Sequence, residues 1–467
     1  MMQQTIDYVD DLVRNHNERL VQVILAIYAF AGIVFIGVTL QKEIGFEPVW
    51  IARAVASGDG FSFPFKLAWL CTDLCEQGRQ TGNFIASAWA DPIFTYFYAA
   101  LIYVFGEETA RLIIRPLHLA LFIVACVYTA KTARHLAGPW AAIIALGFLL
   151  VATKHHATTI NSAPVATLWI SLIAYNLVRY FDDPSRMRVL ALGVLMALSA
   201  MSWSSTILFI PVVVIVILLQ GNFRLPALQS SALAVLVAVV IISPWSWRNY
   251  VVFDEFVPVR NGVGQVAWIG TIGAAGTFKQ NVSTSEIPAP YASKGPGDAI
   301  RGIIGTTGAE NLFALEQWQE AIMDEQIPEK STNFNEATQD KWLFKQARSF
   351  VFEQPFAAAQ LAFFKLHAFA DRVDFPVPYT GWLSTIMTVL TYIAIIGGFY
   401  LITVRIEASA LVLMLAAFVA PFVAIAPYYY RYRQPIDPIF SILLGVTIVT
   451  LVEIARHHAR NRRPSVD

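Results

Sequence analysis

The first hydrophobic span of this chain is followed by residues 45–53, which read Gly-Phe-Glu-Pro-Val-Trp-Ile-Ala-Arg. The carboxylate of Glu47 thus comes directly after a membrane exit, ahead of an amphipathic helix expected over 49–57 and closed by Gly58-Asp59-Gly60. An acid at the membrane surface suits a catalyst whose substrate joins a lipid tail to a water-side head group. A transporter keeps its polar groups nearer the bilayer midplane. An ordinary solvated loop carboxylate is the other interpretation.

The composition is typical of a membrane protein with many spans. Hydrophobic residues make up 56% of the 467 residues and charged residues 14%, and the mean hydropathy is +0.55. The net charge is zero, which gives nucleic-acid binding no electrostatic support. Residues 1–18 are polar and are not expected to be a cleaved signal peptide. Cys71 and Cys75 are as compatible with a strained disulfide as with two free thiols.

Ten apolar runs are predicted to cross the membrane. They cover residues 19–40, 112–130, 139–153, 160–178, 189–201, 206–219, 228–242, 382–404, 408–425 and 439–451. The shorter run Pro92–Phe105 is predicted to lie in the outer interface. Ten crossings put both ends of the chain on one side, together with most basic connections, which is the positive-inside pattern. Arg111 and Arg115 stand on the other side, against that rule.

This pattern predicts an all-α polytopic membrane protein with its functional residues on the outer face. The expected parts are a cytoplasmic segment over 1–18, an N-terminal transmembrane module over 19–242 with outer juxtamembrane helices within 41–111, an outer region over 243–381, C-terminal transmembrane helices over 382–455 and a basic cytoplasmic tail over 456–467. Within the outer region, short helices are expected around 310–322 and 335–351.

The outer face holds two candidate catalytic acids, Glu47 and Asp91, and Glu43 is a rival to the first. Asp91 precedes Pro92, so a plain helix N-cap is its alternative role. The candidate substrate-binding cations are Arg53, Lys154, His155, His156, Arg248, Lys365, Arg431 and Arg433. An arginine fork binds phosphate oxygens through two hydrogen bonds, and snorkelling to lipid head groups is the competing role. Adjacent histidines are a weak metal signal, so no metal is assigned and any cofactor is unknown.

Four stretches resemble motifs of the GT-C superfamily of polyprenyl-phosphate-dependent glycosyltransferases, in the branch of protein mannosyltransferases and aminoarabinose transferases. The stretches are 46–65, 91–106, 243–262 and 430–438. A helix expected over 344–372, with Pro355 and Lys365, is similar to the exit from the large outer loop of that family. The resemblance covers roughly residues 19–451, thinly between the motifs.

The resemblance implies an inverting transferase that takes a sugar from a polyprenyl-phosphate donor at the outer leaflet, with the first-loop acid as catalytic base. The acceptor is a glycan, a lipid or a protein, membrane lipids are the other partners, and no nucleic acid is expected. A bacterial inner (plasma) membrane, with the active site on the periplasmic side, is the expected location in the cell envelope. The chain departs from the family in two places. Glu47 stands without the usual acidic neighbour, and Asn161-Ser162 occupies the place of the second acid.

Two other classes of function remain open from the sequence. A transporter or flippase of lipid-linked sugars would carry broken helices and buried charges at the midplane, whereas the predicted spans have few ionisable residues in their central turns. A non-catalytic relative that assists envelope assembly is the second alternative, because the second acid is missing. The donor sugar and the acceptor depend on pocket shape and are not encoded in these motifs.

Overall fold

The computed structural model describes residues 2–39, 47–63, 85–153, 160–268, 270–271, 336–370, 382–424 and 432–461. Nearly all of them are helical, as the sequence predicts. The exception is a two-residue antiparallel pair, β1 (Ser62–Phe63) and β2 (Ile85–Ala86). The expected helix around 310–322 and the cysteines Cys71 and Cys75 lie outside the described residues.

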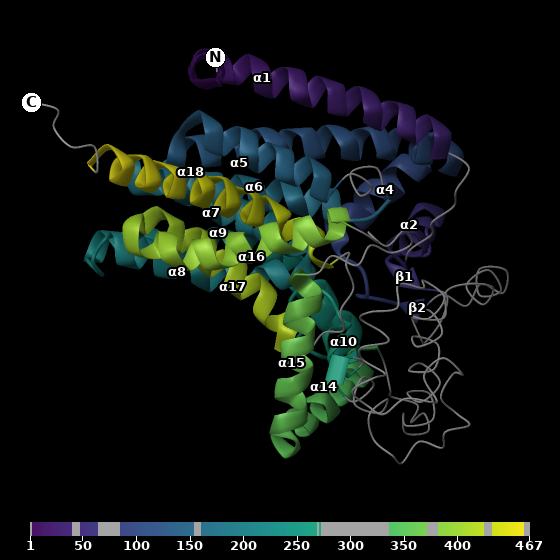
Figure 1. Ribbon diagram of the computed structural model, residues 1–467. Coiled ribbons are helices and arrows are strands. Elements are labelled where there is room, and N and C mark those ends of the chain that lie inside the picture. Colours follow the sequence, from purple (N-terminus) through teal and green to yellow (C-terminus); the bar gives the residue numbers. More distant parts are fainter. Residues whose placement is uncertain are drawn as a thin grey trace, which may run out of the picture.

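Long helices lie side by side and form the body of the molecule (Figure 1). They are α1 (Met2–Thr39), α5 (Glu107–Ala152), α6 (Ala163–Asp182), α7 (Arg186–Ser202), η1 (Ser204–Leu208) with α8 (Phe209–Gln220), α9 (Leu225–Phe253), α16 (Trp382–Val404), α17 (Ile406–Ala424) and, after η4 (Gln434–Ile436), α18 (Asp437–Asn461). The start of α1 and the end of α18 lie at the same end of this bundle.

Shorter elements gather at the opposite end of the bundle from the start of α1 (Figure 1). They are α2 (Glu47–Ser57), the β1–β2 pair, α4 (Pro92–Phe105), α10 (Val263–Trp268), α14 (Glu336–Glu353) and α15 (Pro355–Ala370). Helix α2 packs on α4 through Val49 and Ala52 against Phe94 and Tyr98. This packing brings the helix after the first span against the helix predicted for the interface.

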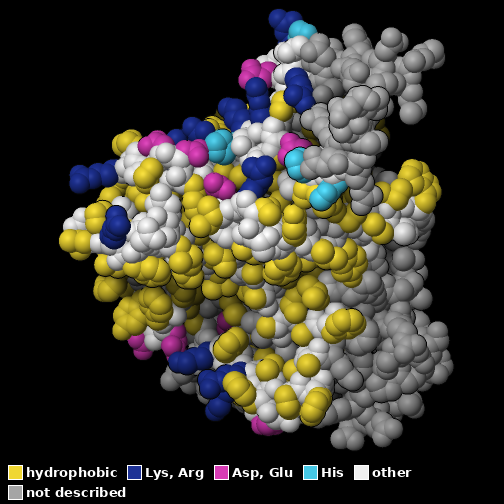
Figure 2. All heavy atoms as spheres, turned by 60° about the vertical axis from the view of Figure 1, so that its left-hand side comes forward, with side chains coloured by type: hydrophobic (Ala, Val, Ile, Leu, Met, Phe, Trp, Pro, Cys, Tyr) yellow, Lys and Arg dark blue, Asp and Glu magenta, His cyan; other side chains and the backbone are white. Residues whose placement is uncertain are grey.

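Six helices in the described part of the chain are long and apolar enough to cross a membrane, which supports an integral membrane protein. Figure 2 shows one face on which hydrophobic side chains fill the middle and charged side chains gather above and below. The predicted number of crossings, ten, is larger. Helices α6, α7 and α8 occupy three of the predicted spans but are not among these six helices. The number of ten crossings therefore stays a prediction.

Helix α5 contains two of the predicted spans. Its backbone leaves helical geometry at Ala137 and Gly138, where Gly138 has φ +82°, just before Pro139. Residues from both sides of the break, such as Leu119 and Leu149, pack in one cluster with α1. The break therefore separates two helical arms, in agreement with the predicted runs 112–130 and 139–153.

Two helix boundaries differ from those predicted. The span expected over 228–242 continues as α9 to Phe253 with Pro244 inside the helix, because the buried face beyond the proline still packs through Trp245. The helix expected over 344–372 is wrong as a single element, because the chain breaks after Glu353 and restarts at Pro355, the first residue of α15. Proline has no N–H to donate and its ring clashes with the preceding turn, so it begins a helix more readily than it continues one.

Candidate functional site

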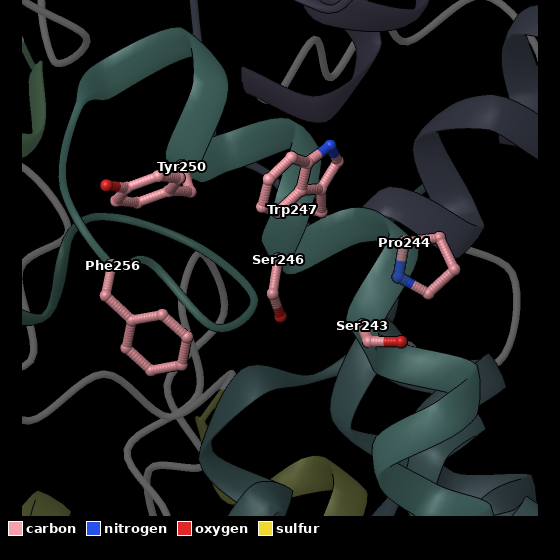
Figure 3. A pocket seen from close by; sticks show the side chains of 6 residues that line it. All are labelled: Ser243, Pro244, Ser246, Trp247, Tyr250 and Phe256. Atoms are coloured by element: carbon pink, nitrogen blue, oxygen red, sulfur yellow. The ribbon is translucent and has the colours of Figure 1, made fainter.

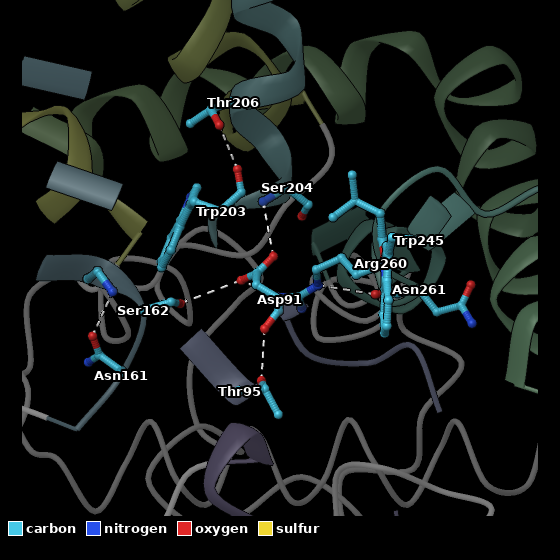
Figure 4. Close-up of polar contacts among 12 residues, drawn as sticks. Asp91, Thr95, Asn161, Ser162, Trp203, Ser204, Thr206, Trp245, Arg260 and Asn261 are labelled. Atoms are coloured by element: carbon cyan, nitrogen blue, oxygen red, sulfur yellow. Dashed lines mark hydrogen bonds and ion pairs between the residues drawn. The ribbon is translucent and has the colours of Figure 1, made fainter. Parts of the chain in front are cut away.

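Asp91 is buried at the start of α4 and is contacted from three other segments (Figure 4). Its Oδ1 accepts a hydrogen bond from the backbone N–H of Ser204 at 3.1 Å, at the start of η1. Its Oδ2 lies 3.5 Å from both the Ser162 hydroxyl and Nη1 of Arg260. Since these partners come from before α6, from η1 and from the loop after α9, the tertiary fold alone assembles this site.

The carboxylate of Asp91 does not cap α4. Asp91 is the N-cap residue by position, and Pro92 occupies the first turn, but the side chain makes no capping hydrogen bond. The alternative role as a plain N-cap is therefore wrong. Thr95 instead donates its hydroxyl hydrogen to the backbone carbonyl of Asp91 at 2.8 Å. Burial raises the pKa of Asp91 to about 6, while the nearby charge of Arg260 opposes that rise.

Arg260 is a site residue that the sequence analysis did not identify. It lies in the loop between α9 and α10, and its side chain is 27% exposed beside the buried Asp91. The guanidinium carbon lies 6.0 Å from the ring centroid of Trp89, and Nε donates to the carbonyl of Asn261 at 3.2 Å. The only sequence signal was an arginine just before Asn261-Gly262, inside the motif that begins at Ser243.

Side chains of α9 hold the loop that carries Arg260. Asn249 is fully buried and donates to the carbonyls of Val257 and Val259, each at 3.1 Å. Trp245 donates its indole N–H to the same Val259 carbonyl. The loop is therefore fixed at several backbone positions next to Arg260, which limits the movement of that guanidinium.

Helix α14 closes the site from the outer region through Glu336. The carboxylate of Glu336 accepts hydrogen bonds from the Ser87 hydroxyl (2.7 Å), the Ala88 N–H (2.9 Å) and the Asn261 amide (2.8 Å). Burial raises the pKa of Glu336, and these three hydrogen bonds oppose the rise. Asp340, one turn later, accepts from the backbone N–H groups of Gly264 and Gln265. The start of α14 is therefore hydrogen-bonded to Ser87 and Ala88, just before Asp91, and to the segment 261–265, just after Arg260.

Arg248 and Arg433, two of the predicted phosphate ligands, are engaged inside the protein. Arg248 donates to the carbonyls of Ser87 (2.7 Å) and Phe61 (2.9 Å). Arg433 is fully buried, and its Nε lies 3.0 Å from the carboxylate of Asp437. Its two other nitrogens donate to the Phe369 carbonyl and the Thr391 hydroxyl. These contacts join separate helices, so a phosphate-binding role for either arginine stays a prediction.

Two further predicted cations occupy different surroundings. Arg53 pairs with Glu107 at the start of α5. Lys365, in α15, is 8% exposed, and no described residue lies within hydrogen-bond reach of its ammonium. Burial lowers the pKa of Lys365 to about 7. Neither residue contacts the Asp91–Arg260 pair in any described interaction.

Several predicted site residues lie outside the described part of the chain. They are Glu43, Lys154, His155, His156 and Arg431. Glu47 is described only as the first residue of α2. Its role as base therefore stays a prediction. In the described residues no group of three or more His, Cys, Asp or Glu side chains is arranged to hold a metal ion.

An apolar groove of about 570 Å³ opens on the exposed face of α9 (Figure 3). Its lining residues are Ser243, Pro244, Ser246, Trp247, Tyr250 and Phe256. Trp247 and Phe256 are 67% and 74% exposed, so two large aromatic side chains stand unburied on one surface. The Ser246 hydroxyl donates to the carbonyl of Pro258 at 2.6 Å, in the same loop that continues to Arg260.

No family model and no curated protein matches the chain. The solved structures that match include the archaeal oligosaccharyltransferase AglB from Archaeoglobus fulgidus, in complex with an inhibitory peptide and a dolichol-phosphate. This match has a TM-score of 0.49 and 9% identity, and covers 97% of this chain and 53% of that one. ArnT from Cupriavidus metallidurans bound to undecaprenyl phosphate has a TM-score of 0.36 and 16% identity, covering 96% and 81%.

The chain spans about half the length of the AglB chain that it matches. The AglB structure contains a dolichol-phosphate, and the ArnT structure contains undecaprenyl phosphate.

Proposed function

We propose that this protein is a membrane glycosyltransferase that moves a sugar from a polyprenyl-phosphate donor to an acceptor at the outer face of the membrane. The observation that carries this function is the Asp91–Arg260 pair. A carboxylate and a guanidinium from distant segments meet at the end of the bundle that holds the short helices, beside a fixed loop that runs from an apolar groove. Proton transfer, phosphate binding and tail binding each have candidate residues there.

The reaction needs a base for the acceptor and a cation for the phosphate. In an inverting transfer the acceptor oxygen attacks the anomeric carbon, the bond to the donor phosphate breaks, and the acceptor proton passes to a carboxylate. A carboxyl group with a pKa of about 6 is mostly ionised at neutral pH and is well matched to proton transfer, as Asp91 is. Glu47, at the start of α2, is the other candidate base. Arg260 is the described cation best placed to bind the departing phosphate.

The groove on α9 is proposed to hold the isoprenoid tail. Its aromatic and proline side chains offer apolar contact, and Ser243 and Ser246 add two hydroxyl groups to the lining (Figure 3). An isoprenoid entering from the bilayer would lie along α9, and the loop from Phe256 to Arg260 would lead its phosphate end toward the charged pair. Dolichol-phosphate and undecaprenyl phosphate, the ligands of the solved neighbours, are of this chemical class.

We place the bundle in a bacterial inner membrane, with the end that holds the short helices on the periplasmic side. The positive-inside pattern supports this orientation, because most basic connections fall at the opposite end. The proposed divisions follow from it: 1–18 and 456–467 are cytoplasmic, 19–242 and 382–455 form the membrane bundle, and 243–381 is the outer region.

The decisive experiment compares Glu47→Gln, Asp91→Asn and Arg260→Lys in membrane vesicles that carry a radiolabelled polyprenyl-phosphate sugar. Replacement of the catalytic base should lower the rate of sugar transfer by roughly 10²–10⁴-fold. It should leave donor binding intact. Arg260→Lys keeps the charge and loses the fork, so donor affinity should fall. Arg188→Gln, at an exposed ion pair with Asp183, is the matched control.

The same assay separates the competing functions. If Glu47→Gln transfers sugar at the wild-type rate while Asp91→Asn is inactive, Asp91 is the base. Movement of the labelled lipid from one leaflet of the vesicle membrane to the other, without transfer of its sugar, would instead indicate a flippase. Wild-type vesicles that neither transfer nor move the lipid, across a panel of donor sugars, would contradict the enzyme and leave a role in envelope assembly.

A further inference from the structure

Gln434 is a buried glutamine whose amide makes no hydrogen bond to any described residue. It opens η4, the short helix ahead of α18, and is 2% exposed. Both its Oε1 and its Nε2 are shielded from solvent and lack a partner in the described part of the chain. The preceding residue, Arg433, is also buried, but its nitrogens contact the Asp437 carboxylate, the Phe369 carbonyl and the Thr391 hydroxyl. The unmatched amide is therefore particular to Gln434.

Helix η4 lies at the end of the bundle that holds the Asp91–Arg260 pair. It packs on α6, which begins directly after Ser162, and the Ser162 hydroxyl lies 3.5 Å from Oδ2 of Asp91. It also leads into the start of α18, whose other end lies beside the start of α1, at the opposite end of the bundle (Figure 1). Gln434 is thus buried on the side of the bundle where the candidate base lies.

Aromatic rings connect η4 to the contacts of Asp91. Tyr432, two residues before Gln434, stacks on Phe422 with ring centroids 5.2 Å apart and meets the edge of Trp203 at 6.4 Å. Trp203 immediately precedes Ser204, whose backbone N–H donates to Asp91 (Figure 4). Trp203 and Tyr432 are only partly buried. A continuous series of contacts therefore runs from the segment that carries Gln434 to the candidate base.

Folding alone does not account for a glutamine at this position. Buried polar side-chain groups are nearly always hydrogen-bonded, because burying them without a partner costs stability. An apolar side chain of the same length would join the core formed by the neighbouring Ile436 and Phe440 at no such cost. Residues that break a packing rule in this way are typical of functional sites. The amide of Gln434 fits a ligand that supplies both an acceptor and a donor.

We infer that Gln434 binds hydroxyl groups of the donor sugar and so helps to determine which sugar is transferred; this inference rests on the proposed function. A carboxamide offers an acceptor oxygen and N–H donors, and each sugar hydroxyl can both donate and accept. Small-molecule sites combine apolar and aromatic walls with a few such polar groups, and Trp203 and Tyr432 supply the aromatic part. Because an amide carries no charge, Gln434 suits a free hydroxyl rather than a charged substituent of the sugar.

The test uses the full chain, purified in a neutral detergent, with Gln434→Met and Gln434→Asn. Methionine keeps the length of the side chain without the amide, and asparagine keeps the amide on a shorter stem. Gln229→Met is the matched control, because Gln229 is exposed near the start of α9. Native mass spectrometry measures binding of a polyprenyl monophosphate and of the same lipid phosphate carrying glucose, mannose, galactose or arabinose. The apparent melting temperature of each protein is measured without ligand.

We expect the wild type and Gln229→Met to bind one of the sugar-bearing lipids at least about tenfold more tightly than the monophosphate. Gln434→Met should lose this preference and keep the affinity for the monophosphate, and Gln434→Asn should fall between. Without ligand, Gln434→Met should melt at or above the temperature of the wild type, because the unpaired amide is gone.

Three results would overturn the inference and leave the proposed donor-lipid site in place. They are a wild type without preference for any of the sugars, equal sugar preference in the wild type and Gln434→Met, and a marked fall in the melting temperature of Gln434→Met, which would assign the amide to folding. A wild type that binds neither the monophosphate nor any sugar-bearing lipid would contradict the proposed function as well.

Discussion

Replacing Asp91 by Asn keeps the shape of the side chain and removes a charge that burial disfavours. Burial raises the pKa of Asp91 from 3.8 to about 6 in the folded protein. Between about pH 4 and pH 6 the folded state therefore binds more protons than the unfolded state, so the stability of the wild type falls as the pH rises through this window. Above this window, the raised pKa lowers the free energy of unfolding by about 3 kcal/mol relative to an aspartate whose pKa does not change on folding.

The apparent melting temperature in detergent, measured from about pH 4 to pH 7.5, tests this reasoning. Protonated Asp91 and asparagine are both neutral, so the two proteins should converge at low pH. Toward neutral pH the wild type should become less stable relative to Asp91→Asn. Arg260→Gln removes the charge that opposes the rise in the pKa of Asp91, and should move the window to higher pH.

Asp183→Asn is the control, because Asp183 is an exposed carboxylate whose side chain is 56% accessible. It should follow the wild-type profile. Parallel pH profiles for the wild type and Asp91→Asn, or a wild type that gains on the variant as the pH rises, would refute the account of Asp91 as a buried acid with a raised pKa.

Three other changes test separate parts of the fold. Arg433→Gln leaves Asp437 buried without its cation, so the apparent melting temperature should drop markedly, since losing one partner of a buried pair costs roughly 3–5 kcal/mol; an unchanged value would contradict the pair. Gly264→Ala drives a methyl group into the backbone of α14 and should abolish the folded peak in size-exclusion chromatography, whereas Gly37→Ala, in open space on α1, should keep it. Burial lowers the pKa of Lys365, so Lys365→Met should have a higher apparent melting temperature than the wild type near neutral pH. This difference should shrink toward about pH 10, as the lysine becomes neutral in the unfolded state as well as in the folded state.

Hydrophobic runs and proline–glycine punctuation made most helices predictable. The bounds of Pro92–Phe105 coincide with those of α4, because Pro92 begins the helix and Gly106, with φ +77°, ends it. The end of α9 was not predictable in the same way. Pro244 and the polar residues after Ile242 signal a loop, yet the helix continues because its buried face still packs through Trp245.

The candidate site was only partly predictable. Asp91 stood out as an acid before a proline, but its real partners come from remote segments and include a backbone N–H, which no side-chain pattern encodes. Arg260 lies in a loop without periodicity, so nothing local distinguished it from a solvated arginine. Arg433 shows the opposite problem: its tyrosine-rich surroundings suggested a membrane-surface ligand, whereas it pairs with Asp437 four residues later, and the fold brings the Phe369 carbonyl and the Thr391 hydroxyl to it.

The close packing of α18 on α5 has a consequence for how the protein is made. Gly445 lies so near the Ala141 carbonyl that a methyl group there would collide with it, and α18 is the most buried of the six membrane-length helices. During synthesis, the face of α5 that receives α18 stays without this partner in the bilayer until α18 leaves the ribosome. Newly inserted chains would then depend on lipids or an insertase to shield that face, and a ribosome stalled before α18 would release a bundle with an open seam, which is a natural target for membrane proteases.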